Sequence, residues 1–102
     1  MDVEALRMAA TTLRDKLEFY KHRDPDASIL LLDLEDLLSR AERGQITEMV
    51  ESRDIPGYKL FTETSLQSYE DLEAAYTDFY IELIEARETE AYKMLAAKMA
   101  KD

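Results

Sequence analysis

The sequence predicts an all-α protein: a three-helix bundle with an irregular connection before a long third helix. Apolar residues recur at steps of three and four over long stretches, which is the period of an amphipathic helix. Only two glycines and two prolines interrupt the 102 residues, and 46% of the residues are hydrophobic. A chain of this length and composition forms one core, so residues 1–102 are expected to be a single helical domain.

The first helix is predicted over residues 3–23. Its apolar positions follow one another at steps of three and four, as one face of a helix requires. These positions are Val3, Leu6, Ala10, Leu13, Leu17 and Tyr20. Lys21, His22 and Arg23 follow, where positive side chains meet the negative end of the helix dipole.

The second helix is predicted over residues 25–43. Proline is favoured at its first position, and Asp24 can accept hydrogen bonds from the free backbone amides there. Gly44 suits the left-handed residue that often ends a helix. The core stripe comprises Leu30, Leu34, Leu37 and Ala41, widened by Leu31 and Leu38. Ile29 and Leu32 lie outside this stripe, so the helix is apolar on more than one side.

Residues 45–67 are predicted to form the irregular connection. The spacing of Ile46, Met49 and Val50 indicates one or two short helical turns. The proline and glycine of the segment 55–58 suit the central positions of a type II turn. The β-prone segment 58–62 is expected to be extended and to pack over one end of the bundle.

The third helix is predicted over residues 69–100. Residues 68–71 match a capping box, the pattern that opens many helices. The expected core stripe comprises Leu72, Tyr76, Phe79, Leu83 and Ala86. No glycine or proline follows Gly57, so the sequence contains no signal that ends this helix before about residue 100.

The charge of the chain excludes several classes of partner. It holds 23 acidic and 13 basic residues, which gives a net charge of −10. A nucleic-acid-binding protein needs a basic surface, and an anionic membrane surface would repel this chain. The longest apolar run, residues 29–32, is far too short to span a bilayer, and residues 1–4 lack the features of a secretory signal. The absence of cysteine fits a cytoplasmic protein.

The sequence predicts no catalytic residue, metal site or cofactor, so we expect a protein that is not an enzyme. His22 is the single histidine and lies between two basic residues at a helix end, without the spacing of a catalytic triad. A di-metal carboxylate site would need Glu-x-x-His pairs, which are missing. Asp24, Asp26 and Ser28 resemble the start of a calcium loop, but Ile29 occupies the position that requires glycine. Catalysis by a pair of carboxylates ranks below the binding functions.

Two stretches, residues 24–39 and residues 60–86, contain acidic side chains and no basic ones. In the third helix four acidic residues are predicted to lie opposite the core stripe, at steps of seven, four and three. These residues are Asp71, Asp78, Glu82 and Glu85. An acidic face aids solubility, but like charges four residues apart repel, and a basic partner would offset that repulsion.

The second helix adds apolar side chains to this acidic surface. Ile29 and Leu32 are predicted to project near Asp33 and Asp36, away from the core stripe. An apolar centre with a charged rim is typical of a protein–protein interface. The alternative is that Ile29 and Leu32 pack under the connection, and the sequence favours neither interpretation.

Two segments carry a resemblance to a known family. Residues 56–63 (Pro-Gly-Tyr-Lys-Leu-Phe-Thr-Glu) and residues 72–80 (Leu-Glu-Ala-Ala-Tyr-Thr-Asp-Phe-Tyr) resemble small helical immunity proteins that neutralise type VI secretion toxins of the NAD-hydrolysing type. The resemblance lies in the spacing of apolar and aromatic positions. It implies a protein that binds over the active site of a toxin.

The leading hypothesis is therefore an immunity or antitoxin-like inhibitor of a basic toxin, and the alternative is a structural or adaptor protein that acts as a homo-oligomer. The alternative depends on the C-terminal end of the third helix. There Ala91, Leu95 and Met99 form a second apolar line, accompanied by Lys93, Lys98 and Lys101. These lysines are opposite in sign to the rest of the chain, so one chain's C-terminal end could dock on another's acidic face.

Overall fold

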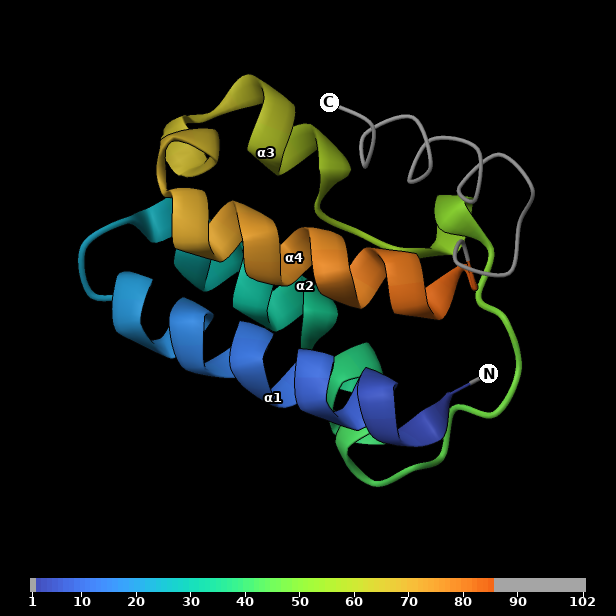
Figure 1. Ribbon diagram of the computed structural model, residues 1–102. Helices are drawn as coiled ribbons and strands as arrows, with labels where there is room; N and C mark the ends of the chain where they lie inside the picture. The colour runs from blue at the N-terminus through green and yellow to red at the C-terminus, as the bar shows by residue number, and fades with distance from the viewer. Residues whose placement is uncertain (1, 86–102) are drawn as a thin grey trace, which may run out of the picture.

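A computed structural model of the chain describes residues 2–85, and this part of the protein is all-α without a strand (Figure 1). It holds four α-helices, one more than the predicted three, and two short 3₁₀-helices. In chain order they are α1 (Val3–Tyr20), α2 (Pro25–Glu42), η1 (Ser52–Asp54), α3 (Tyr58–Glu63), η2 (Ser65–Ser68) and α4 (Glu70–Leu83). The predicted all-α class is confirmed, whereas the three-helix bundle with a long third helix is not.

Helix α1 packs against both other long helices, α2 and α4 (Figure 1). Its buried side chains form the predicted stripe: Leu6, Ala10, Leu13 and Leu17. The two ends of that stripe, Val3 and Tyr20, are only partly buried. From α2 and α4, side chains such as Leu34 and Phe79 complete the same core, and both are fully buried.

The connection between α2 and α4 contributes to this core with Ile46, Ile55, Phe61 and Leu66. Gly57 lies close to both helices: a Cβ atom here would stand 2.5 Å from Leu30 Cδ1 and 3.1 Å from Tyr76 Cε2. Its φ of 111° is also the left-handed conformation that the third residue of a type II turn adopts. Tyr76 donates its hydroxyl to the Pro56 carbonyl at 2.9 Å, which fixes this turn to α4.

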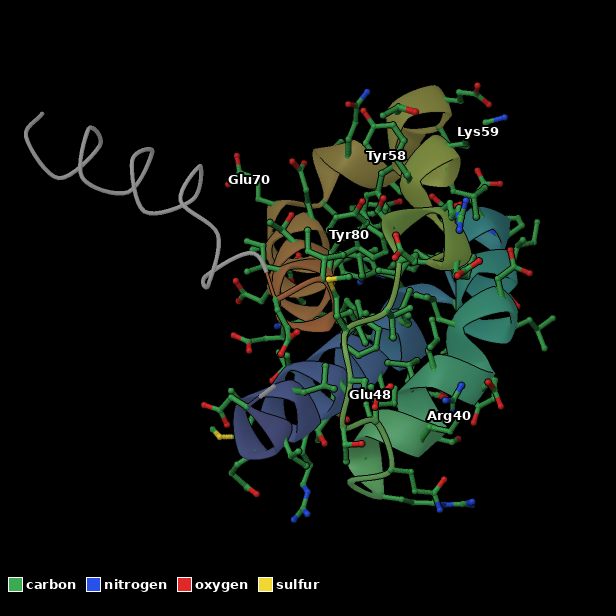
Figure 2. The ribbon with its side chains drawn as sticks, turned by 90° about the vertical axis from the view of Figure 1, so that its right-hand side faces the viewer. Arg40, Glu48, Tyr58, Lys59, Glu70 and Tyr80 are labelled. Atoms are coloured by element: carbon green, nitrogen blue, oxygen red, sulfur yellow. The ribbon has the colours of Figure 1, made fainter. Side chains whose placement is uncertain are left out.

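Two predictions for the connection are wrong. Residues 45–51 form no helical turn, whereas residues 58–63, expected to be extended, form α3. The helical conformation places Phe61 in the core, with its ring 4.6 Å from that of Tyr76, and leaves Tyr58 and Lys59 exposed on the outside (Figure 2). Burial of one aromatic side chain therefore outweighs the modest β-propensity of this segment.

The ends of α1 and α2 follow local sequence signals. Asp2 accepts a hydrogen bond from the Ala5 amide, and Asp24 accepts one from the Asp26 amide, so both aspartates cap a helix. Gly44 has a φ of 70° and follows α2 as predicted. Helix α1 ends at Tyr20, three residues earlier than predicted, because residues 21–23 form a turn.

Helix α4 is shorter than the predicted third helix and starts without a capping box. Ser68 belongs to η2 and donates its hydroxyl to the Ser65 carbonyl, so it caps nothing on α4. At the other end α4 stops at Leu83, whose carbonyl accepts the Val50 amide at 2.8 Å, and Glu85 follows with a φ of 54°. The prediction of one continuous helix over 69–100 is therefore wrong, and its part beyond residue 85 lies outside the described residues.

Candidate functional site

The exposed side of α2 is the candidate site. Ile29 is 47% exposed and Leu32 is 75% exposed, and at 100° per residue both lie on the same face as Asp33 and Asp36. The connection instead packs against Leu30, on the inner side of the helix. The alternative in which it covers Ile29 and Leu32 is therefore wrong. We refer to Ile29, Leu32, Asp33 and Asp36 together as the α2 outer face.

The two carboxylates of the α2 outer face differ in their surroundings. Asp36 forms an ion pair with Arg40 at 3.3 Å, one helical turn away, and both side chains are well exposed. Such a pair contributes little to stability in water. Asp33 is exposed and forms no ion pair with any residue in the range 2–85. The face thus has at least one carboxylate that is available to a positively charged group.

A groove of about 640 Å³ runs beside the α2 outer face. Asp33, Asp36 and Arg40 line it from α2, and Met49 and Asp54 line it from the connection. Figure 2 shows Arg40 on α2 next to the part of the connection that carries Glu48. Met49 is 49% exposed, so it adds a flexible apolar side chain to the edge of the α2 outer face.

Two other acids of the 24–39 stretch, Asp24 and Glu35, serve the fold. Asp24 is 7% exposed and accepts hydrogen bonds from the Tyr69 hydroxyl at 3.0 Å and the Ser65 hydroxyl at 3.3 Å. Glu35 receives two hydrogen bonds from Arg14, at 2.8 Å and 3.1 Å. These bonds lower the pKa of Glu35 and raise the pKa of Arg14. Contacts with distant residues therefore compensate acids that have no base near them in the sequence.

The four predicted acids of the third helix do not form one exposed stripe. Asp71 is paired with α1: its carboxylate accepts the Tyr20 hydroxyl at 2.7 Å and lies 3.4 Å from Lys16 Nζ. The Tyr20 hydroxyl, and after it Lys16, lower the pKa of Asp71. Asp78 is exposed, as predicted. Asp71 and Asp78 are thus not equivalent surface charges.

The remaining two acids are not on a solvated face, and for Glu82 the helical period gives the reason, because it directly precedes the core residue Leu83 and lies about 100° from the core stripe rather than opposite it. Glu82 is only 8% exposed, because it lies on the side of α4 that faces α1, with Met8 and Ala9 lining the same depression. The prediction that it belongs to a solvated face is wrong. Glu85 lies beyond the end of α4 and is partly buried. The structure therefore brings together the four predicted residues of α2 but not the four of α4.

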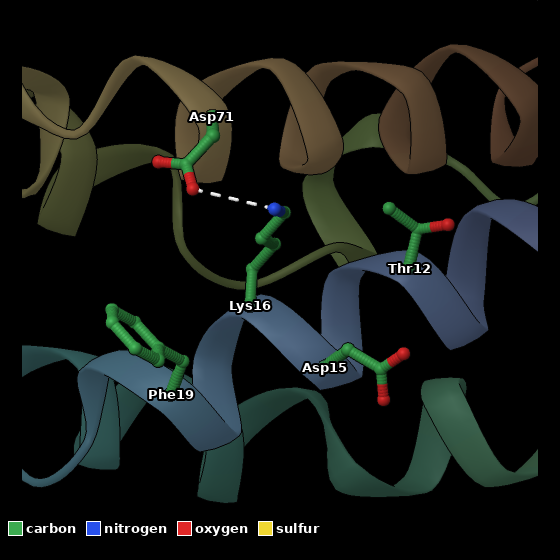
Figure 3. A pocket seen from close by; sticks show the side chains of 5 residues that line it. All are labelled: Thr12, Asp15, Lys16, Phe19 and Asp71. Carbon is green, nitrogen blue, oxygen red and sulfur yellow. Dashed lines mark ion pairs between the residues drawn. The ribbon is translucent and has the colours of Figure 1, made fainter.

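A pocket of about 460 Å³ lies between α1 and the start of α4 (Figure 3). The Lys16–Asp71 ion pair bridges its two sides, and Thr12, Asp15 and Phe19 complete the lining. None of these side chains forms a nucleophile–base pair. His22 is exposed at the end of α1. Within the described part of the chain no group of three or more histidine, cysteine or acidic side chains could hold a metal ion.

Phe19 is an exposed aromatic residue that the sequence did not single out. It is 56% exposed, and the Arg23 guanidinium lies 5.0 Å above its ring. Its position outside the α1 core stripe is the signal that could have identified it. Among residues 2–85 no helix is long and apolar enough to cross a membrane.

No protein-family model, curated protein or solved structure matches this chain. What the protein does is therefore inferred from its own residues.

Proposed function

We propose that the protein is a non-catalytic, acidic binding module of the cytoplasm, an immunity or antitoxin-like inhibitor that covers the active site of a basic toxin. The observation that carries this proposal is the α2 outer face. It combines two exposed aliphatic side chains, Ile29 and Leu32, with the carboxylates of Asp33 and Asp36.

The apolar part of this face supports a protein partner. A leucine that is 75% exposed gains little from the fold of its own chain, but it gains substantially when a partner removes it from water. Interfaces place such side chains at their centre and charged groups around them. Ile29 and Leu32 are both about half exposed or more and lie on one face of α2, and Met49 is similarly exposed beside Asp33 and Asp36, so a partner would find apolar side chains on both sides of the carboxylates.

The charge of the protein indicates the chemistry of the partner. The chain carries a net charge of −10, and its exposed carboxylates would attract a basic surface from a distance. Enzymes that act on nucleic acids or dinucleotides hold phosphate groups in positively charged clefts. Asp33 and Asp36 would occupy such a cleft in place of the substrate phosphates. The resemblance of residues 56–63 and 72–80 to immunity proteins supports the same class of partner.

The test is to identify the partner by cross-linking in the native host and then to measure toxicity. We expect that the partner arrests growth when it is expressed alone and that co-expression of this protein restores growth. The double variant Leu32→Lys, Asp33→Lys should fail to restore growth, because it places positive charge at the contact. Met8→Lys, Asp15→Lys is the matched control, since it makes the same change in charge at two exposed side chains of α1.

Two results would contradict the proposal. A partner that is harmless when expressed alone would exclude a toxin inhibitor. Capture of nothing but further copies of this chain would favour the alternative, a structural or adaptor protein that acts as a homo-oligomer.

A further inference from the structure

The chain itself contains a segment whose chemistry is complementary to the α2 outer face. Residues 91–101 (Ala-Tyr-Lys-Met-Leu-Ala-Ala-Lys-Met-Ala-Lys) contain three lysines and no acidic residue, whereas residues 24–39 contain acids and no base. We propose that residues 91–101 of a second copy dock on the α2 outer face and so form a homodimer. This inference does not depend on the proposed toxin partner.

The two sequences are complementary in charge and in apolar spacing. On α2, the exposed Leu32 is followed directly by the exposed Asp33. In the segment 91–101, Lys98 directly precedes Met99, and Leu95 stands four residues before Met99. Leu32 and Asp36 are one helical turn apart and adjoin on the surface of α2, so an apolar contact and an ion pair with the segment can form side by side there. Methionine suits a contact of this kind, because its unbranched side chain adapts to irregular surfaces.

Three other acids of the two base-free stretches are poorer candidates for this contact. Glu35 is already bound to Arg14, Asp71 is paired with Lys16, and Asp24 is buried. The closest rival is the depression between α1 and α4, where the exposed Met8 lies near Asp78. It offers one large exposed apolar side chain, whereas the α2 outer face offers two and has Met49 beside it.

The symmetry of the dimer depends on how the two copies exchange their segments. A segment that docks on a different surface of another copy makes a heterologous contact, which either propagates or closes. Two copies that exchange their segments reciprocally close it, and each dimer then contains the same contact twice. The proposal is this reciprocal dimer, and sedimentation velocity distinguishes it from a filament by the size of the species formed.

The experiment is a charge-swap cycle on the full chain. One variant reverses the face (Asp33→Lys, Asp36→Lys), a second reverses the segment (Lys98→Glu, Lys101→Glu), and a third combines all four changes. Dimer dissociation constants are measured by sedimentation velocity over a range of concentrations. Circular dichroism checks that each variant is folded, which is expected because both aspartates are exposed.

The proposal makes a distinct prediction for each variant. Either reversal alone should weaken the dimer by about tenfold or more, because like charges then face one another. The combined variant should return close to the affinity of the wild type, since the opposite charges meet again with the signs exchanged. The matched control Glu73→Lys, Asp78→Lys, on the exposed side of α4, should leave the dimer unchanged.

Several outcomes would overturn the proposal. A wild-type chain that is monomeric at every concentration excludes the dimer. A dimer that survives either reversal, or a combined variant that stays monomeric, excludes this particular contact. If the α4 control weakens the dimer equally, the segment does not dock specifically on the α2 outer face, and the contact is either unspecific attraction or the depression beside Asp78. Reversal of the segment leaves the α2 outer face intact, so it tests the dimer without changing the surface proposed for the toxin.

Discussion

The α2 outer face and helix α4 are both rich in carboxylates, but the carboxylates of the two helices have different surroundings. On α2, Asp33 and Asp36 are exposed beside Leu32, and the core lies on the other side of the helix. On α4, Asp71 is bound to Tyr20 and Lys16, and Glu82 is buried on the side that faces α1. A run of acids is therefore not in itself a binding surface. It becomes one where the carboxylates remain exposed and apolar side chains accompany them.

The largest expected effect is a difference in the free energy of unfolding between substitutions on the inner and outer sides of α2. Leu34→Ala, on the fully buried inner side, should lower the free energy of unfolding by about 3 kcal/mol, because it leaves a cavity in the core. Leu32→Ala, on the outer side, should change it by less than about 0.5 kcal/mol. Urea denaturation followed by circular dichroism measures both. Equal losses would mean that Leu32 is covered within the monomer.

The second prediction compares two acids one turn apart on α4. Glu82→Lys should lower the free energy of unfolding by about 2 kcal/mol, since it places the opposite charge at a site that is 8% exposed. Asp78→Lys should stay within about 0.5 kcal/mol of the wild type, because Asp78 is exposed. Thermal unfolding of the two variants measures both changes. A Glu82→Lys variant as stable as the wild type would contradict the assignment of Glu82 to the interior.

The third prediction concerns the rate at which the proposed basic partner associates. Asp33→Lys with Asp36→Lys should reduce the association rate by about tenfold, and Asp78→Lys should reduce it less. Raising the ionic strength should slow association of the wild type and change dissociation little, because salt screens exposed charges. Stopped-flow fluorescence measures both rates. An association rate that salt does not change would leave the apolar contact as the main determinant.

The smallest expected effect is on the stability of the protein at acidic pH, through the contact of Asp71 on α4 with Tyr20 and Lys16 on α1. The Tyr20 hydroxyl and Lys16 lower the pKa of Asp71 in the folded state, so this contact stabilises the protein above the usual carboxyl range. The contribution is lost as the pH falls through the lowered pKa. In Tyr20→Phe the melting temperature should therefore depend less on pH below about 4 than in the wild type. The same acid dependence in both proteins would mean that the hydroxyl does not hold Asp71.

Helices α1 and α2 could be predicted from the sequence because the signals that define them are local. Their apolar stripes recur with the helical period, and residues close to each helix end, Asp2, Asp24 and Gly44, cap the backbone. The direction in which Ile29 and Leu32 project could be predicted for the same reason, whereas only the structure shows that the connection leaves them exposed. Once the inner stripe of a helix is known, the helical period alone places Ile29 and Leu32 on the opposite side.

Tertiary contacts decided the features that the sequence left open or predicted wrongly. Helix α4 ends at Leu83 without a glycine or proline, because Val50, which is distant in sequence, donates its amide to the Leu83 carbonyl. Burial of Phe61 in the core favours the helical conformation of residues 58–63. Glu82 is buried where α4 packs against α1. Each of these contacts joins residues far apart in the chain. Local propensities differ by only about 1 kcal/mol, so burial against a distant segment outweighs them.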